Sequence, residues 1–504
     1  MTLEQAREKL TDLQKAVAAY QHALGLLFFD GATTAPRGTA ANRGRTMSVL
    51  SQALYQLNTR PDTVELLAFL EESRGQLTGR ERRMVDLLRK EGRKMERIPA
   101  EEYMAFRRLS VEANAVWRTA KEHSDFALFA PYLQKRFDMS RQIARYCAPD
   151  MDPYDFWLGD NEEGISRARC DAFFDVVYHR IIPLLQAVQS RPQLDNAIIK
   201  GHFPIPQQAV LAHKLMDILQ LDPLHVGLAT TEHPFTTSLG SHLDERISTH
   251  YFEEDYSYSM FSVIHEGGHA LYNTGSDDAL AYTVLDGGVS MCVHESQSRF
   301  YENYLGRSRA FCEYLFPILR EIFPEHLQNG TAEEFYRAIN RVEPTLIRTQ
   351  ADELTYCLHV LVRYELEKAV MDGALSVDDM PGEWNRLYKE YLGIDVPDDR
   401  RGILQDSHWA DGYLGYFPSY ALGNAYGAQF LRKMRETVDV DDCLRRGDLG
   451  PINDWNRQHI WQYGCLYRPA DLFRRATGED FDPTVYTDYL EEKYTALYGL
   501  TPRR

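Results

Sequence analysis

Apolar residues recur at intervals of three and four positions along most of this 504-residue chain, the spacing that buries one face of an α-helix. From residue 3 to about residue 147 the pattern predicts successive amphipathic helices, punctuated by Pro36, Pro61, Pro99 and Pro131. The same spacing returns later in the chain and predicts helices over residues 331–339, 346–371, 381–391, 420–437 and 483–498. A mainly α-helical fold is therefore expected.

The period changes near residue 226. Two short stretches, residues 226–231 and 246–251, are rich in β-branched side chains, and Gly240 and Ser241 lie between them. Such stretches favour strands over helices. We therefore expect a small antiparallel sheet, followed directly by a helix over residues 258–272, where the apolar spacing is again helical.

Composition and charge set bounds on the protein class. Hydrophobic residues make up 44% of the chain, which is enough for a large core, and the length alone would allow three domains. The formal net charge of −18 and the pI near 5.4 disfavour a surface for nucleic acid or anionic lipid, because phosphates attract clusters of Lys and Arg. We expect neither a nucleic acid nor a membrane as a partner.

Cysteine usage and the N-terminal residues indicate the compartment. The seven cysteines are scattered and form no C-x-x-C pair, so they suggest neither a disulfide framework nor a thiolate zinc site. Residues 1–23 lack the basic start and long apolar core of a signal peptide, and the apolar cluster at residues 24–29 is too short to span a membrane. We expect a complete, cytoplasmic protein with reduced cysteines.

The predicted helix over residues 258–272 contains the pattern H-E-x-x-H. Histidines four positions apart share one helix face, so His265 and His269 can hold one metal ion with Glu266 beside it. The alternative is a pair of buried structural histidines, although chance gives this pattern only roughly 0.04 times per 500 residues. Gly267 and Gly268 cost a helix roughly 2 kcal/mol relative to alanine, which suggests close approach by substrate or a neighbouring strand. The pattern is the core of a zinc peptidase.

A catalytic zinc site needs a third protein ligand and keeps its fourth position for water. Glu295 is the best candidate, 26 positions after His269 on a helix predicted over residues 288–304. Residues 273–287 are rich in glycine and aspartate and are predicted to form a loop that turns the chain back. A glutamate on a returning helix is typical of the gluzincin class. The alternative is that Glu295 is an exposed helix residue without a ligand role.

Four more motifs accompany the two metal motifs. They are His233-Pro234-Phe235, D-x-R-x-T at residues 244–248, I-R-x-x-A-D at residues 347–352 and G-x-x-Q-D-x-H-W at residues 402–409. The motifs occur in the same order as in the carboxypeptidase Taq family of metallocarboxypeptidases. The chain resembles this family from near the N-terminus to about residue 430. It departs from the family pattern at Ser248, where the pattern has threonine, and the hydroxyl is kept.

This resemblance implies a fold similar to that of neurolysin and angiotensin-converting enzyme, in which helices enclose a deep central groove. It implies one catalytic unit over residues 1–504 in two lobes: residues 1–150 would roof the groove, and residues 151–504 would carry the metal site and the substrate-binding portion. The family also implies a homodimer. The chain would then be one peptidase rather than several domains.

The expected chemistry follows from these residues. One Zn²⁺ per chain, for which Co²⁺ is a possible substitute, would be held by His265, His269 and Glu295 and would lower the pKa of a bound water. Glu266 would take the proton of that water and later pass it to the leaving amine. An oxyanion donor is also required. We expect Tyr420 in this role, with His408 second, whereas plain packing is the alternative for a tyrosine in a chain with 30 of them.

A carboxypeptidase must bind the free C-terminal carboxylate of its peptide substrate, and the planar guanidinium of arginine suits this task. Arg348 and Arg246 are the candidates from the matched motifs, and His233 is expected to contact the peptide near the scissile bond. Either arginine could instead form a structural ion pair, and Asp352 lies four positions after Arg348.

We therefore expect a zinc-dependent metallocarboxypeptidase that releases single C-terminal residues. One rival hypothesis is an oligoendopeptidase with the same metal site and an open-ended groove. Another is a catalytically silent peptide-binding protein, which the intact Glu266 disfavours because a binder has no use for a general base beside a metal ion.

Overall fold

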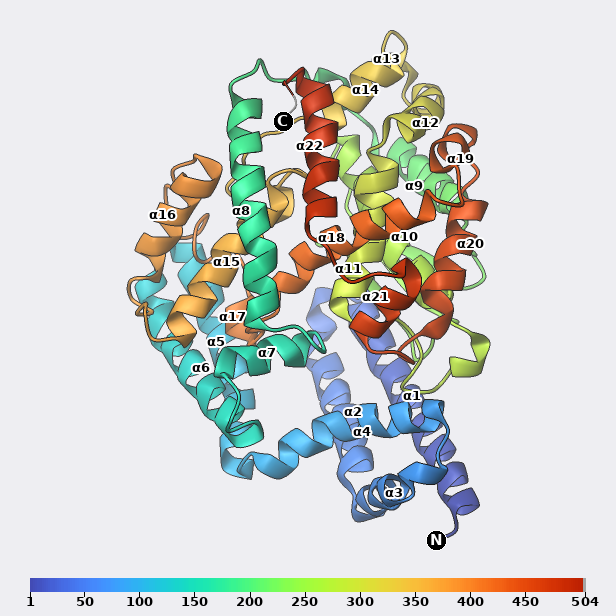
Figure 1. Cartoon of the computed structure of the whole chain (residues 1–504), viewed down its shortest axis with the longest axis vertical. Helices are drawn as coiled ribbons and strands as arrows, with labels where there is room; N and C mark the ends of the chain where they lie inside the picture. Colours follow the sequence, from blue (N-terminus) through green and yellow to red (C-terminus); the bar gives the residue numbers. More distant parts are fainter. Residues whose placement is uncertain (502–504) are drawn as a thin grey trace. The chain divides into compact units, whose positions relative to one another are not determined.

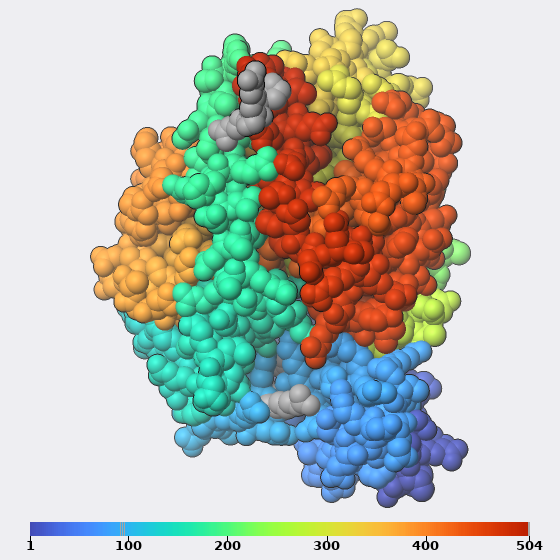
Figure 2. All heavy atoms as spheres, viewed as in Figure 1, coloured from blue at the N-terminus to red at the C-terminus, as the bar shows by residue number. Residues whose placement is uncertain are grey.

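The computed structural model describes residues 1–501, apart from the side chains of Glu91, Arg93 and Met95. The chain folds into two compact units, each built from three separate stretches. The first unit comprises Met1–Gly92, Asn196–Ile339 and Phe430–Asp480, and the second comprises Arg93–Asp195, Asn340–Gln429 and Phe481–Arg504. In Figure 2 the first unit therefore takes its atoms from the blue, the green-to-yellow and the orange-red parts of the colour scale.

The first unit contains the predicted metal motifs and the sheet. Its helices are α1 (Leu3–Thr33), α2 (Ala40–Thr59), α3 (Pro61–Glu72), α9 (Ile205–Leu219), α10 (Tyr256–Thr274), α11 (Met291–Arg299), α12 (Arg309–Ile322), α13 (Pro324–Leu327), α14 (Ala332–Ile339), α19 (Val440–Arg446), α20 (Gly450–His459) and α21 (Pro469–Thr477). A π-helix, Phe300–Gly306, follows α11 directly. The helix α10 packs against α9, α11 and the sheet, and α9, α10 and α11 lie near one another in Figure 1.

The second unit is built from long helices. They are α5 (Ala100–His123), α6 (Phe126–Cys147), α7 (Pro153–Asn161), α8 (Arg167–Gln189), α15 (Tyr356–Met371), α16 (Met380–Leu392), α17 (His408–Asp411) and α22 (Thr484–Tyr498). The helices α8, α15 and α16 pack together, as Figure 1 shows. Two helices, α4 (Gly79–Arg97) and α18 (Phe417–Met434), contain the residues at which the chain passes from one unit to the other.

The sheet has three strands in the order β1 (Val226–Thr230), β3 (Glu245–Thr249), β2 (Thr236–Ser238). The expected antiparallel pairing of the two predicted strands is wrong, because β1 and β3 run parallel, with Val226 opposite Glu245. The reason is β2, which is too short for the sequence pattern to reveal. It already forms the antiparallel hairpin with β3, so β1 occupies the other edge of β3 and runs in the same direction.

Most predicted helices are confirmed, with two informative differences. The helix expected from residue 346 begins only at Tyr356, because Asp352 binds the backbone N–H groups of Thr355 and Glu343 and holds the preceding chain in a loop. Pro131 does not interrupt a helix, since α6 continues through it. Among the residues that the structure describes, no helix is both long and apolar enough to cross a bilayer.

The N-terminal helices share their core with the loop after α10. Buried residues of α1, α3 and α4 pack against this loop, and the cluster includes Leu10, Leu13, Leu66, Leu70, Val85, Leu280 and Leu285. The buried Gln14 reinforces the contact by accepting a hydrogen bond from the Val284 N–H. The division predicted near residue 150 falls inside the second unit, and a roof formed by residues 1–150 over a groove stays a prediction.

Candidate metal centre and substrate-binding residues

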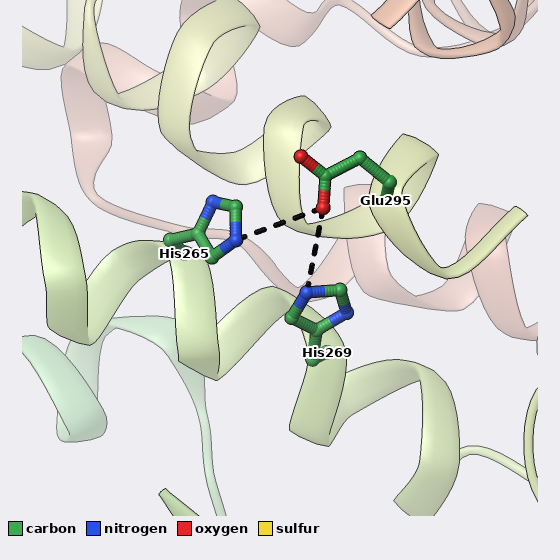
Figure 3. Close-up of side chains that lie close together, drawn as sticks. All are labelled: His265, His269 and Glu295. Carbon is green, nitrogen blue, oxygen red and sulfur yellow. Dashed lines mark ion pairs between the residues drawn. The ribbon is translucent and has the colours of Figure 1, made fainter. Parts of the chain in front are cut away.

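Two neighbouring helices of the first unit bring the predicted metal ligands together. His265 and His269 lie one turn apart on α10, and Glu295 faces them from α11 (Figure 3). Glu295 Oε2 lies 3.8 Å from His265 Nε2 and 3.7 Å from His269 Nε2. One ligand atom from each of the three residues lies within 4.8 Å of the others, and Glu295 is buried.

This arrangement fits a divalent metal ion. Two ligand atoms that bind one zinc ion tetrahedrally are roughly 3.4 Å apart. The two separations around Glu295 Oε2 exceed this value by only a few tenths of an ångström. They are also too long for hydrogen bonds, so the three atoms converge on one point without bonding one another. Two imidazole nitrogens and one carboxylate oxygen are a donor set that zinc accepts.

The outer side of His265 is held by a carboxylate that the sequence analysis did not single out. His265 Nδ1 lies 2.8 Å from Glu302 Oε2, which directs Nε2 toward Glu295. Arg299 bonds both Glu295 and Glu302, at 2.8 and 3.0 Å, and Arg307 bonds the other oxygen of Glu302. Although burial acts in the opposite direction, Arg299 and His265 hold the pKa of Glu302 well below its usual range. Glu302 thus stays charged and orients the ligand ring.

A second histidine plays the corresponding part for His269. The Nδ1 atoms of His269 and His294 are 3.3 Å apart, and the ring of His294 packs against Tyr272. Burial lowers the pKa of His294 to about 4, and burial together with the charge of His265 lowers the pKa of His269. Both rings are therefore neutral near pH 7, and the neutral imidazole is the form that binds a metal ion.

Glu266 lies on the same helix, buried, and is not part of the ligand cluster. Its Oε2 accepts a hydrogen bond of 2.6 Å from the hydroxyl of Thr236 on β2. Burial raises the pKa of Glu266, and the charge of His265 and the bond from Thr236 oppose that rise. A carboxylate with a raised pKa beside a metal site has the chemistry of a general base.

The two glycines of the metal motif are closely approached, as expected, but the approaching elements are helices rather than the strand or substrate that the sequence suggested. A Cβ atom on Gly268 would lie 2.8 Å from the carbonyl oxygen of Gln297 and from Cα of Ser298, both on α11. On Gly267 it would lie 2.6 Å from the side chain of Leu219 at the end of α9. Gly268 therefore permits the approach of the helix that carries Glu295.

The sheet positions the other candidate residues of the first unit. Arg246 lies in β3, where it pairs with Asp244 of the same motif at 2.6 Å and crosses over Gly227 of β1. The hydroxyl of Ser248 accepts the N–H of Phe235 at 2.8 Å, so the retained hydroxyl ties two family motifs together. His233 lies in the loop before β2, and it is exposed.

In the second unit, the two remaining motifs bind each other through Arg348. Its Nε and Nη2 donate to Oδ1 of Asp406, at 3.2 and 2.9 Å, and its Nη1 donates to Tyr356. Arg363 pairs with the other oxygen of Asp406 at 2.5 Å. The structural partner considered for Arg348, Asp352, is wrong, because that carboxylate caps backbone N–H groups instead.

His408 and Tyr420 lie beside this ion cluster. His408 Nε2 and the hydroxyl of Tyr420 are 3.1 Å apart, and the guanidinium of Arg348 lies 4.9 Å from the centre of the Tyr420 ring. Burial lowers the pKa of His408 to about 4, despite the opposing charge of Asp406. The second unit therefore groups Arg348, His408 and Tyr420, whereas the first groups the metal ligands, Glu266, Arg246 and His233.

Sequence reasoning missed the residues that support the ligands and the base. Glu302 could have been predicted from the sequence, because it lies seven positions after Glu295, a spacing that places both on one helix face. Thr236 could not, since it reaches Glu266 from a strand 30 positions earlier. Supporting residues of this kind are found from the fold rather than from a local pattern.

Comparison with known proteins agrees with this geometry. The family model described as carboxypeptidase Taq (M32) metallopeptidase matches residues 9–494. Carboxypeptidase 1 of Bacillus subtilis is 37% identical over 99% of this chain and 100% of its own length. Thermostable carboxypeptidase 1 of Thermus thermophilus is 36% identical, again over 99% and 100%.

Solved structures agree as well. The M32 carboxypeptidase from Deinococcus radiodurans superposes with a TM-score of 0.95 at 35% identity and covers 98% of this chain and 100% of its own. The Pyrococcus furiosus carboxypeptidase superposes with a TM-score of 0.93 at 31% identity, over 97% and 99%. The chain is a metallocarboxypeptidase, a peptide hydrolase, and it belongs to the carboxypeptidase Taq (M32) family.

Proposed function

We propose that this metallocarboxypeptidase uses one zinc ion, held by His265, His269 and Glu295, to release single residues from the C-termini of peptides. The observation that carries the proposal is the convergence of three ligand atoms next to a buried glutamate that does not join them. When bound, zinc supplies a Lewis acid that polarises a scissile carbonyl and makes water a better nucleophile at neutral pH.

Glu266 is the general base in this proposal. Its carboxylate takes a proton from the attacking water and then delivers it to the nitrogen of the departing residue. The apolar neighbours Val263, Ile264, Ala270 and Leu271 are buried around the motif and exclude bulk water from this exchange.

Tyr420 is the proposed donor to the oxyanion that forms at the scissile carbonyl, and His408 is the second choice. The contact between the two side chains supports the pairing, because a neutral imidazole nitrogen and a phenol hydroxyl orient each other. With its low pKa, His408 would act as a neutral partner rather than as a fixed cation.

Arg348 is the proposed anchor of the substrate carboxylate. Guanidinium has five N–H donors, and three of those on Arg348 bond Asp406 and Tyr356, which leaves two for a bound carboxylate. Asp406 would then orient Arg348 rather than compete with the substrate. Arg246 is the alternative anchor, and the exposed His233 is proposed to contact the peptide near the scissile bond.

The exopeptidase claim is tested with two N-acyl dipeptides that differ only in a free or an amidated C-terminus. Turnover should nearly vanish on amidation, because the amide removes the charge that the arginine binds. Equal turnover of both substrates would favour an oligoendopeptidase with the same metal site. No turnover of either substrate by the metal-loaded protein would favour a silent peptide-binding protein.

Zinc itself is tested by metal analysis of the purified protein, followed by removal with a chelator and reloading with zinc or cobalt. Glu295→Ala should lower bound metal and activity together, because one of three ligands is lost. Full metal occupancy in that variant would exclude Glu295 from the site. Glu245→Ala is not a suitable control, because Glu245 lies in β3 and accepts a hydrogen bond from Asn273 of α10, the helix that carries both histidines. Glu353→Gln in the second unit serves instead.

We also propose a homodimer in the cytoplasm. The dimer is an expectation from the family, and light scattering on a size-exclusion column tests it. The compartment is supported by the seven cysteines, none of which forms a disulfide within the residues that the structure describes, and six of which are buried. Cell fractionation with an antibody against the protein tests the location.

A further inference from the structure

One hydroxyl group contacts the proposed base directly. Thr236 Oγ1 lies 2.6 Å from Oε2 of Glu266 and 3.0 Å from the backbone oxygen of the same residue. A hydroxyl has one proton, and the shorter contact to the charged acceptor takes it. Oε2 of Glu266 is thereby held, and the other carboxylate oxygen is the one left for a proton from water.

We propose that Thr236 is a positioning residue, whose hydroxyl fixes the carboxylate of Glu266 in the orientation needed for proton transfer. The inference rests on the proposed role of Glu266 as the general base. It adds a residue that touches neither metal nor substrate in this scheme and acts only through Glu266. Misplacing a reacting group by about 1 Å can lower a rate roughly 100-fold, so the orientation of this side chain matters.

The position of Thr236 is itself fixed by the sheet. Thr236 opens β2 and lies opposite Ile247 of β3. The residue before it, Phe235, is bonded through both backbone groups to Ser248, with its N–H 2.8 Å from the Ser248 hydroxyl and its carbonyl 3.0 Å from the Ser248 N–H. Ser248 thus holds Phe235 in place, and Phe235 is the neighbour of Thr236, whose hydroxyl bonds Glu266.

The chain offers a matched control at the next position. Thr237 follows in β2, and successive side chains of a strand point to opposite faces. Its side chain therefore points away from the face that carries the hydroxyl of Thr236 to Glu266. Replacing Thr237 by valine changes the strand in the same chemical way without removing the contact.

The experiment compares Thr236→Val, Thr236→Ser and Thr237→Val in the zinc-loaded enzyme on one N-acyl dipeptide. Thr236→Val keeps the shape and deletes the hydroxyl, so kcat should fall by about 10- to 100-fold, while KM and bound metal change little. Thr236→Ser restores a hydroxyl and should recover most of kcat. Thr237→Val should stay near the wild-type rate.

Three outcomes for kcat would overturn the proposal: an unchanged kcat in Thr236→Val, an equal loss in Thr236→Val and Thr236→Ser, or a loss in Thr237→Val equal to that in Thr236→Val. A rise in KM at constant kcat would also overturn it, because Thr236 would then contact substrate. If Thr236→Val does not fold, Thr236→Ala takes its place. Glu266→Gln, measured in parallel, separates the proposed role of Glu266 from that of Thr236. An active Glu266→Gln enzyme would reject Glu266 as the base. An inactive Glu266→Gln enzyme together with an unaffected Thr236→Val enzyme would reject only the positioning role of Thr236.

Discussion

The metal centre of the first unit and the ion cluster of the second unit both gather buried charged groups, but they differ in whether the facing atoms bond one another. Around Asp406, the arginine nitrogens lie within 2.5 to 3.2 Å of a carboxylate oxygen, so the charges satisfy one another. Around Glu295 Oε2, the two histidine nitrogens stay 3.7 and 3.8 Å away. Charged atoms that already bond one another hold a shape, whereas ligand atoms that face one another without bonding can hold an ion.

The pKa shifts of the two carboxylates Asp406 and Glu266 also differ between the two units. Although burial acts to raise it, Arg348 and Arg363 hold the pKa of Asp406 well below its usual range, and this carboxylate stays charged. Burial instead raises the pKa of Glu266, and no arginine bonds its carboxylate among the contacts described. The first arrangement suits a fixed anchor, and the second suits a group that gains and loses a proton.

Glu266→Gln should give the largest effect among the variants. It tests whether this carboxylate, which gains and loses a proton in the proposal, is the general base. The amide is nearly isosteric but cannot accept a proton at neutral pH, so kcat should fall roughly 100- to 10,000-fold. Bound metal, measured by elemental analysis, should stay near one per chain because the three ligands are untouched. Near-normal turnover would remove Glu266 from the role of base.

Arg348→Ala tests whether the ion cluster of the second unit, whose charges pair with one another, also binds substrate. Loss of a charge-assisted pair should lower kcat/KM for free-carboxylate peptides about 10- to over 100-fold, and it should affect amidated peptides little. The ratio between the two substrates should therefore collapse. Arg348→Lys should restore only part of it, because a point charge cannot form the bidentate fork.

A neighbouring arginine supplies the control. Arg363→Lys keeps a cation near Asp406 at a residue that is not proposed to touch substrate, so the ratio between the two peptides should be kept. If Arg348→Ala weakens both substrates equally, Arg348 is structural and Arg246 becomes the leading anchor.

The sequence predicted the elements and ligands whose spacing is local. His265, His269 and Glu295 follow from helix periodicity and a turn between two helices, and the structure brings them together. The order of the sheet did not follow, because it depends on a three-residue strand that no pattern reveals. The partner of Arg348 did not follow either, since Asp406 lies 58 positions later and only the fold brings it near.

Glu302→Gln should have a smaller effect on the metal centre than loss of a ligand. The amide weakens the interaction that orients His265, and such supporting residues typically change metal affinity by about 10- to 100-fold. Competition with a chelating dye measures this change. Glu353→Gln is the matched control, a buried carboxylate of the second unit paired with Lys493, and it should leave metal affinity unchanged. Equal affinity in Glu302→Gln and wild type would leave Glu302 with a packing role only.

Two glycines extend the comparison to backbone packing, where the expected effects are smallest. In Gly268→Ala the new methyl would meet the backbone of α11, so the helices must separate, at a cost of roughly 1 to 3 kcal/mol of unfolding free energy. Gly382 lies in α16 of the second unit, where a Cβ atom would meet nothing within 4 Å. Gly382→Ala should therefore stabilise that helix by up to about 1 kcal/mol, because alanine restricts the unfolded chain and favours the helix. Calorimetry of the metal-free variants measures both changes, and metal titration should show weaker binding only in Gly268→Ala. If both variants bind metal as the wild type does, the close approach of α10 and α11 is not needed to bring Glu295 to the two histidines.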